Sequence, residues 1–162
     1  MARNKQQDEM TRLGFYGLTP FVLSAVALWT SPIVLPQHVA LDFHQLSLVY
    51  GAVIVAYLSG AGAGVTLTPT QKLRESFLPG QLIALVAFVA IIPDGVLFMW
   101  LGAAWRHTII LVLLIYLLMR DMNATSAGLF PNWYGALRLR LTFWAGLSIL
   151  LIISRLVLWG YY

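Results

Sequence analysis

The chain has 162 residues, of which 60% are hydrophobic and only 10% are charged, whereas a soluble domain carries about 25% charged residues. So much apolar surface argues against a water-soluble fold and predicts that lipid surrounds most of the chain. The absence of cysteine excludes disulfides and metal–thiolate sites. Lys and Arg exceed Asp and Glu by ten to six, but they lie between the apolar runs, which indicates orientation in a membrane and no nucleic-acid partner.

The chain begins with a polar segment, residues 1–12, which contains Asp8 and Glu9. The apolar run that follows extends from about Leu13 to Leu35 and is too long for the core of a cleaved signal peptide. We therefore expect residues 1–12 to be a cytoplasmic N-terminus and residues 13–162 to form a single transmembrane helical domain.

Four further apolar runs follow the first. A bilayer core about 30 Å thick needs roughly 20 apolar residues in a helix. The runs that meet or approach this length are Leu46–Leu67, one from near Phe77 past Ile92, one that ends near Met119, and Leu141–Leu158. The predicted fold is an all-α polytopic membrane bundle of about five transmembrane helices. Residues 37–45 are then the first loop, and residues 121–137 the longest irregular connection.

The boundary between the third and fourth helices has two interpretations. The Pro-Asp-Gly turn signal at residues 93–95 would end the third helix and place Arg106 and His107 inside a long fourth helix. In the alternative, the third helix kinks at Pro93 and the turn lies near Trp105. We favour the turn at Pro93, because Pro and Gly flank an acid there.

Charge placement supports five spans. Cytoplasmic loops of membrane proteins are rich in Lys and Arg. Five spans place eight of the ten basic residues on one side, namely Arg3, Lys5, Arg12, Lys72, Arg74, Arg120, Arg138 and Arg140. The N-terminus is therefore expected in the cytoplasm and the C-terminus on the opposite side, as in a multi-pass protein of a bacterial inner membrane.

The stretch SGAGAGVTLTPT, residues 59–70, contains three glycines two positions apart. It is not a nucleotide-binding loop, because residues 53–67 are uncharged and no Gly-Lys-Ser/Thr sequence is present. In lipid, small residues spaced by four allow helices to approach closely. We therefore predict a helix-packing face of Ser59, Gly60, Ala63 and Gly64.

The segment PNWYGALRLR, residues 131–140, is the richest candidate for a binding surface. Trp133 and Tyr134 suit the depth of lipid headgroups, and Arg138 and Arg140 suit lipid phosphates or the acids of a partner. An ordinary interfacial anchor at the start of the fifth helix would explain the same residues. The sharper hypothesis is a partner- or lipid-binding surface at these four side chains.

Histidines and an acid gather on the predicted outer side. His38, Asp42 and His44 fall in the expected first loop, where spacings of four and two do not define a metal site. We therefore expect no metal and no cofactor. His107 is expected on the same side, without an assigned role.

Two basic residues depart from the cytoplasmic cluster. Arg106 lies twelve positions after Asp94, and a structural ion pair between them is expected at the outer face. Arg155 lies near the end of the fifth helix and is expected to reach the headgroups, or to pair with Asp94 or Asp42. All six acids are expected in loops or at helix ends, which argues against ion-coupled transport.

Short motifs distributed along most of the chain resemble one known family. They are GLTPF at residues 17–21, YGA at 50–52 with YLSG at 57–60, SFLP at 76–79, and PNWY, LR and LT between residues 131 and 142. In this order they are similar to the transmembrane-protein-69-like family, domain of unknown function 3429. Where that family has a basic residue, Trp and Gly after its glycine pair, this chain has Gly62, Ala63 and Gly64. The resemblance implies a small helical membrane protein and lends no established reaction.

Small size, packing glycines and the expected lack of buried titratable groups favour a non-enzymatic accessory, assembly or stabilising subunit of a larger membrane complex, such as a respiratory or photosynthetic one. Its expected partners are the lipid bilayer and other membrane subunits, or a second copy of the chain. The alternatives are a small transporter or channel, and a protein that binds a lipid, quinone or pigment.

Overall fold

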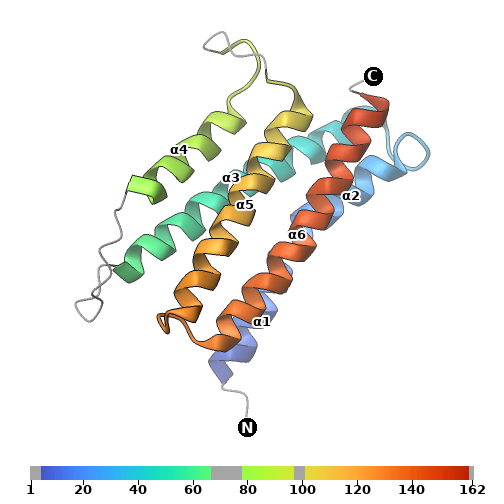
Figure 1. The fold of residues 1–162 in the computed structure, drawn as a ribbon. Helices are drawn as coiled ribbons and strands as arrows, with labels where there is room; N and C mark the ends of the chain where they lie inside the picture. The colour runs from blue at the N-terminus through green and yellow to red at the C-terminus, as the bar shows by residue number, and fades with distance from the viewer. Residues whose placement is uncertain (1–4, 67–77, 97–100, 161–162) are drawn as a thin grey trace.

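The computed structural model describes residues 5–66, 78–96 and 101–160, and these residues form α-helices without a strand (Figure 1). The helices are α1 (Lys5–Tyr16), α2 (Thr19–Thr30), α3 (Gln37–Thr66), α4 (Leu78–Ile91), α5 (Ala103–Ser126) and α6 (Asn132–Trp159). The predicted all-helical bundle is confirmed.

Four stretches are long and apolar enough to cross a membrane: Gln7–Thr30, which joins α1 to α2, then Gln37–Gly62, α5 and α6. The helix α4 is apolar but has only 14 residues. With α4 the chain passes along the bundle five times, so its two termini lie at opposite ends (Figure 1). We call the end with α1 and the α5–α6 connection the N-terminal end.

The first predicted span contains a break between α1 and α2. Pro20 lies in the first turn of α2, where its missing N–H costs no helical hydrogen bond. The carbonyl of Gly17, at the break, accepts a hydrogen bond from the Tyr50 hydroxyl of α3 at 2.8 Å. The helix α1 runs from Lys5 to Tyr16 without a break at residue 12. Among the described residues, the polar N-terminal segment and the start of the first span therefore belong to one helix.

The segment predicted as the first loop, residues 37–45, is helical, and that prediction was wrong. Pro36 precedes α3, and its carbonyl accepts hydrogen bonds from the amides of Val39 and Ala40. The first turns of α3 are amphipathic, with His38 and Asp42 exposed while Ala40 is buried. The polar residues lie on the exposed side of this helix, and their polarity had led to the prediction of a loop.

The long irregular connection expected over residues 121–137 is also corrected. Only residues 127–131 separate α5 from α6. Gly128 adopts φ +78°, a conformation that glycine reaches without steric cost, and its amide bonds to the carbonyl of Thr125. Asp121, expected in this connection, is therefore helical and buried near the end of α5.

The turn predicted at Pro93 is confirmed, since α4 ends at Ile91 and Gly95 has φ +85°. The fourth helix is shorter than that interpretation implied, because α5 begins only at Ala103. Arg106 and His107 consequently lie in the first turns of α5. Residues 97–100, like Lys72 and Arg74, fall outside the described residues.

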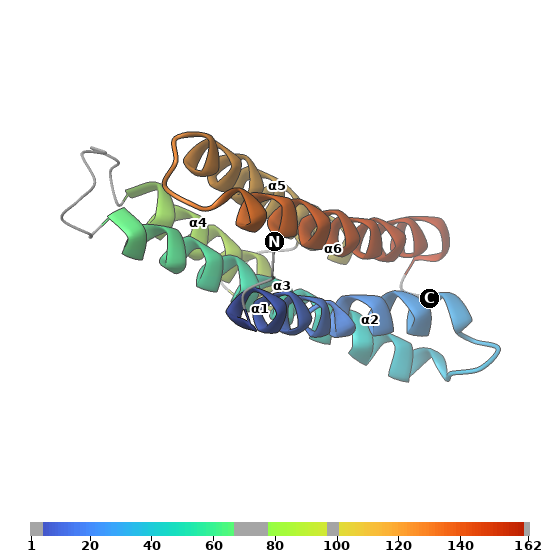
Figure 2. The same ribbon diagram turned by 90° about the horizontal axis from the view of Figure 1, so that it is seen from below.

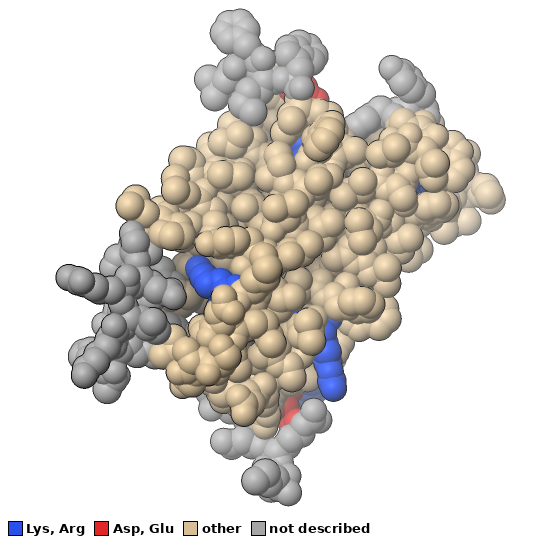
Figure 3. All heavy atoms as spheres, in the orientation of Figure 1, with Lys and Arg blue, Asp and Glu red and all other residues tan. Residues whose placement is uncertain are grey.

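In the bundle, α3 packs against α2, α4 and α5, while α6 packs against α2 and α5 (Figure 2). The main hydrophobic core of the bundle contains buried side chains such as Leu48, Val55, Ile110, Leu117 and Ile149. Most of the face in Figure 3 carries neither acidic nor basic groups. Many large apolar side chains point outward, Val112 and Leu150 among them, as hydrocarbon surroundings permit.

Candidate functional site

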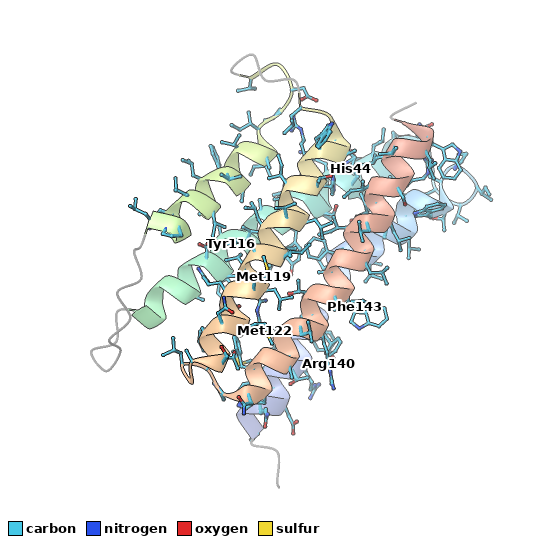
Figure 4. All side chains as sticks on the ribbon, in the orientation of Figure 1. His44, Tyr116, Met119, Met122, Arg140 and Phe143 are labelled. Atoms are coloured by element: carbon cyan, nitrogen blue, oxygen red, sulfur yellow. The ribbon has the colours of Figure 1, made fainter. Side chains whose placement is uncertain are left out.

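The segment predicted as a binding surface, residues 131–140, divides between the surface and the interior. Arg140 is exposed and points away from α5 at the N-terminal end of α6 (Figure 4). Arg138 is only 7% exposed and lies inside the bundle. Trp133 and Tyr134 are half-buried, with ring centroids 6.2 Å apart. The structure therefore does not place the four side chains on one surface, and their predicted binding role stays a prediction.

Arg138 forms a buried ion pair between α6 and α5. Its Nε donates to Oδ2 of Asp121 at 2.8 Å, and the two side chains are 9% and 5% exposed. The other carboxylate oxygen of Asp121 lies 3.7 Å from Nη2 of Arg120. Gly135 permits this close approach of the helices, because a Cβ there would lie 3.1 Å from the Thr125 side chain.

The cluster of Arg120, Asp121 and Arg138, here called the inner cluster, has one more positive charge than negative. Nη2 of Arg138 is buried without a hydrogen-bond partner among the described residues. Arg120 is less buried and extends to α3, where its Nη2 donates to the carbonyl of Leu58 at 3.0 Å. Three helices are therefore joined by guanidinium groups at this end of the bundle.

The glycine stretch contributes to the inner cluster at a position that the sequence did not single out. A Cβ at Gly62 would lie 2.0 Å from Nη2 of Arg120, so glycine makes room for the guanidinium. Ser59 is buried and donates to the carbonyl of Gly80 in α4 at 2.7 Å. Gly62 therefore contacts α5 and Ser59 contacts α4, both inside the bundle.

Two of the other predicted packing residues, Gly60 and Gly64, lie on the outside of the bundle. Gly60 and Gly64 are exposed, and a Cβ at either would meet nothing within 4 Å. Ala63 is helical, but its surroundings lie outside what the structure describes. Ala56 is exposed one turn before Gly60, so Ala56, Gly60 and Gly64 follow one another at a spacing of four. We call these three residues the α3 stripe; no described helix covers it.

At the opposite end, two histidines face each other across α3 and α5. The rings of His44 and His107 are 5.3 Å apart in an edge-on arrangement, and both residues are buried. Nδ1 of His107 lies 2.9 Å from the carbonyl of Ala103 and Nε2 lies 3.1 Å from Oγ of Ser47. Figure 4 shows His44 at this end of the bundle.

The carbonyl of Ala103 fixes a hydrogen on Nδ1 of His107, because a carbonyl oxygen only accepts. The Ser47 hydroxyl donates to the carbonyl of His44 at 2.8 Å, and its oxygen lies within hydrogen-bond distance of Nε2 of His107. Within the described ranges, no three His, Cys, Asp or Glu side chains converge in a way that could hold a metal ion.

The ion pair expected between Asp94 and Arg106 is confirmed. Asp94 also accepts from the amide of Leu101 at 3.1 Å, and Nε of Arg106 donates to the Leu101 carbonyl. The pair therefore closes the connection between α4 and α5. Arg155 makes neither of its expected ion pairs: its Nε donates to the carbonyl of Leu28 at 3.1 Å, and its guanidinium lies 4.7 Å from the centre of the Trp159 ring.

The sequence-based interpretation missed the roles of Asp121, Arg120 and Ser47. A signal for Asp121 existed, since Asp121 and Arg138 lie on either side of a Gly-containing turn that would join antiparallel neighbours. Nothing in the sequence distinguished Ser47 from other serines in apolar runs, because its role depends on α5 being adjacent.

One family model covers most of the chain, and it matches residues 6–154. Its description is protein of unknown function (DUF3429). No curated protein and no solved structure matches the chain. The name transmembrane-protein-69-like stays a prediction. Since the match covers well over half of the chain, the chain belongs to the family of unknown function DUF3429.

Proposed function

We propose that the protein is a non-enzymatic accessory or stabilising subunit that associates with a larger complex in a bacterial inner membrane. The α3 stripe is the observation that carries this proposal. Small residues at a spacing of four allow another helix to approach closely within lipid, and no described helix of this chain occupies that face.

Lipid contact alone gives no reason for glycine at these positions. Acyl chains accommodate large apolar side chains equally well, as the exposed Leu46 and Val53 of the same helix illustrate. Glycine in a helix costs about 1 kcal/mol relative to alanine. A contact with a helix outside the chain would offset that cost.

The buried polar groups support the non-enzymatic part of the proposal. Arg138 joins α6 to α5, Arg120 joins α5 to α3, and Ser59 joins α3 to α4. Each of these side chains therefore makes a contact between helices, and of their polar atoms only Nη2 of Arg138 is buried without a partner among the described residues.

Cross-linking tests the proposal, because the chain has no native cysteine. In native membranes, Ala56→Cys and Gly60→Cys should each give one specific adduct whose second component mass spectrometry identifies. Leu150→Cys on α6, 52% exposed, is the matched control and should give no such adduct. An adduct between two copies of this chain in proteoliposomes would instead identify a homo-oligomer. Equal labelling of all three variants, with a monomer in native gels, would contradict the proposal.

Two measurements distinguish the accessory subunit from a transporter or channel and from a protein that binds a pigment or quinone. Solute flux into liposomes that contain only this protein would support a transporter or channel. A visible absorption spectrum of the purified protein would support a pigment or quinone site, and either result would replace the accessory role.

A further inference from the structure

An apolar groove lies between the first span and α6 on the lipid-facing side of the bundle. Its volume is about 440 Å³, and it is lined by Phe15, Leu18, Thr19, Val22, Leu23 and Trp144. Phe15 and Trp144 remain 43% and 48% exposed, so the groove is open along its length. Its lining suits a hydrocarbon chain.

Two arginines lie at the end of the groove nearest the N-terminus. Gly14 of α1 contacts Leu141 of α6, since a Cβ on Gly14 would lie 2.7 Å from the leucine methyl. Arg12 precedes Gly14 by two residues and Arg140 precedes Leu141 by one. Both spans run in the same direction from this level (Figure 1). At 1.5 Å per residue, the two arginines differ in depth by only about 1.5 Å.

Helical periodicity places these arginines beside the groove. Arg140 and Trp144 are four residues apart on α6, and Arg12 and Phe15 are three residues apart on α1, so each arginine lies one turn before a residue that lines the groove. Arg12 and Arg140 are exposed, and neither is ion-paired with another described residue. A planar guanidinium binds phosphate through two parallel hydrogen bonds.

Acids on α1 restrict the headgroup further. Glu9 lies one turn before Arg12, and Asp8 lies beside it; Lys5, also on α1, adds one positive charge. Asp8 and Glu9 line the same recess of α1 as Arg12, and they lie farther along the helix from the apolar groove than Arg12 does. A headgroup with a second negative charge would be repelled here, whereas an ammonium next to the phosphate would be attracted.

We infer that the groove binds a zwitterionic aminophospholipid, with its phosphate between Arg12 and Arg140, its ammonium toward Glu9, and one acyl chain against Phe15 and Trp144. This site is separate from the α3 stripe and does not depend on the proposed accessory role. The predicted lipid-binding function of Arg140 is retained in this inference, with Arg12 in place of the buried Arg138.

The experiment measures lipids retained by the purified protein in native mass spectrometry, after exchange into nanodiscs of phosphatidylcholine with either phosphatidylethanolamine or phosphatidylglycerol. One phosphatidylethanolamine should be retained in preference to the other two lipids, because phosphatidylglycerol has no ammonium and choline has no N–H group to donate to Glu9. Arg12→Gln with Arg140→Gln should lower retention at least about tenfold, since the loss of even one charge-assisted hydrogen bond has roughly that effect.

Two further variants test the acid and the groove. Glu9→Gln should shift the preference toward phosphatidylglycerol, because it removes the negative charge near the ammonium. Trp144→Ala should weaken retention, while Leu150→Ala, an equally exposed position of α6 outside the groove, should not. Melting temperatures in a neutral detergent confirm that each variant folds. Equal retention of the two headgroups by the native protein, or no effect of the arginine variants, would overturn the inference, as would a polypeptide cross-linked to Trp144→Cys.

Discussion

At the N-terminal end of the bundle an acid and a guanidinium meet inside the protein, whereas at the opposite end the acid of the corresponding pair lies outside it. Asp121 and Arg138 are 5% and 9% exposed and belong to two helices. Asp94 is 51% exposed on a connection, while its partner Arg106 is only 6% exposed. The same two chemical groups therefore hold the bundle together at one end and close a turn at the other.

Burial decides how much each pair matters. Charges removed from water lose their hydration, and the loss is recovered only while both partners are present. At the inner cluster, a lost partner would leave a charge among apolar side chains. Asp94 retains access to water or headgroups, and the buried Arg106 also donates to the carbonyl of Leu101, so this pair depends less on each of its contacts.

The largest expected effect is that of Asp121→Asn. The substitution leaves Arg120 and Arg138 without a counter-ion in the interior, and it should lower the free energy of unfolding by about 3–5 kcal/mol. Unfolding in mixed micelles of increasing SDS content measures this change. The double variant Asp121→Leu with Arg138→Leu should recover most of the loss, because it removes both charges together. A single variant no less stable than the native protein would show that the inner pair is not decisive.

A smaller loss of stability is expected at the buried cluster of His44, His107 and Ser47. Ser47→Ala removes the hydrogen-bond partner of Nε2 of the buried His107 and the donor to the His44 carbonyl, and should cost about 1–3 kcal/mol. The same SDS titration measures it. Ser126→Ala is the control, since Ser126 is exposed and bonds only to a carbonyl of its own helix; it should change stability by less than about 0.5 kcal/mol. If both variants behave alike, the cluster does not stabilise this end.

Gly60 and Gly62 lie only two residues apart in α3, but Gly62 contacts Arg120 whereas Gly60 has open surroundings. Gly62→Ala should displace the Arg120 guanidinium and weaken its bond to Leu58, at a cost of about 1 kcal/mol. Gly60→Ala should be neutral or stabilise the isolated protein by up to about 1 kcal/mol, because its surroundings are open and alanine favours the helix. Tryptophan fluorescence during heating in detergent compares the two. Equal destabilisation would show that Arg120 does not depend on Gly62.

Hydropathy and turn chemistry predicted the helical bundle, the turn at Pro93 and the pair between Asp94 and Arg106. Each of these depends on local signals: apolar length, a Pro-Asp-Gly sequence, or a basic residue within reach of a turn. The family resemblance likewise depended on short motifs in order along the chain.

The helix ends and the inner cluster were harder to predict, for one physical reason. A helix that extends beyond its apolar stretch carries polar residues such as Asp42 or Asn123, and these same residue types also form loops. Once residues 121–137 are interpreted as a loop, Asp121 and Arg138 become surface charges. Their pairing depends on the packing of α5 against α6, which no local pattern specifies.

The smallest expected effect is that of Asp94→Asn. The amide oxygen can still accept from the Leu101 amide and from Arg106, and the buried Arg106 keeps the Leu101 carbonyl as a second acceptor. Only the charge of the half-exposed acid is removed, and the loss should be about 1 kcal/mol or less. Added salt should reduce the difference further between variant and native protein in the SDS titration, because exposed charges are screened, whereas the effect of Asp121→Asn should persist in salt. A loss at Asp94 as large as that at Asp121 would mean that burial does not distinguish the two ends, and that the exposed turn is as important to the bundle as the buried pair.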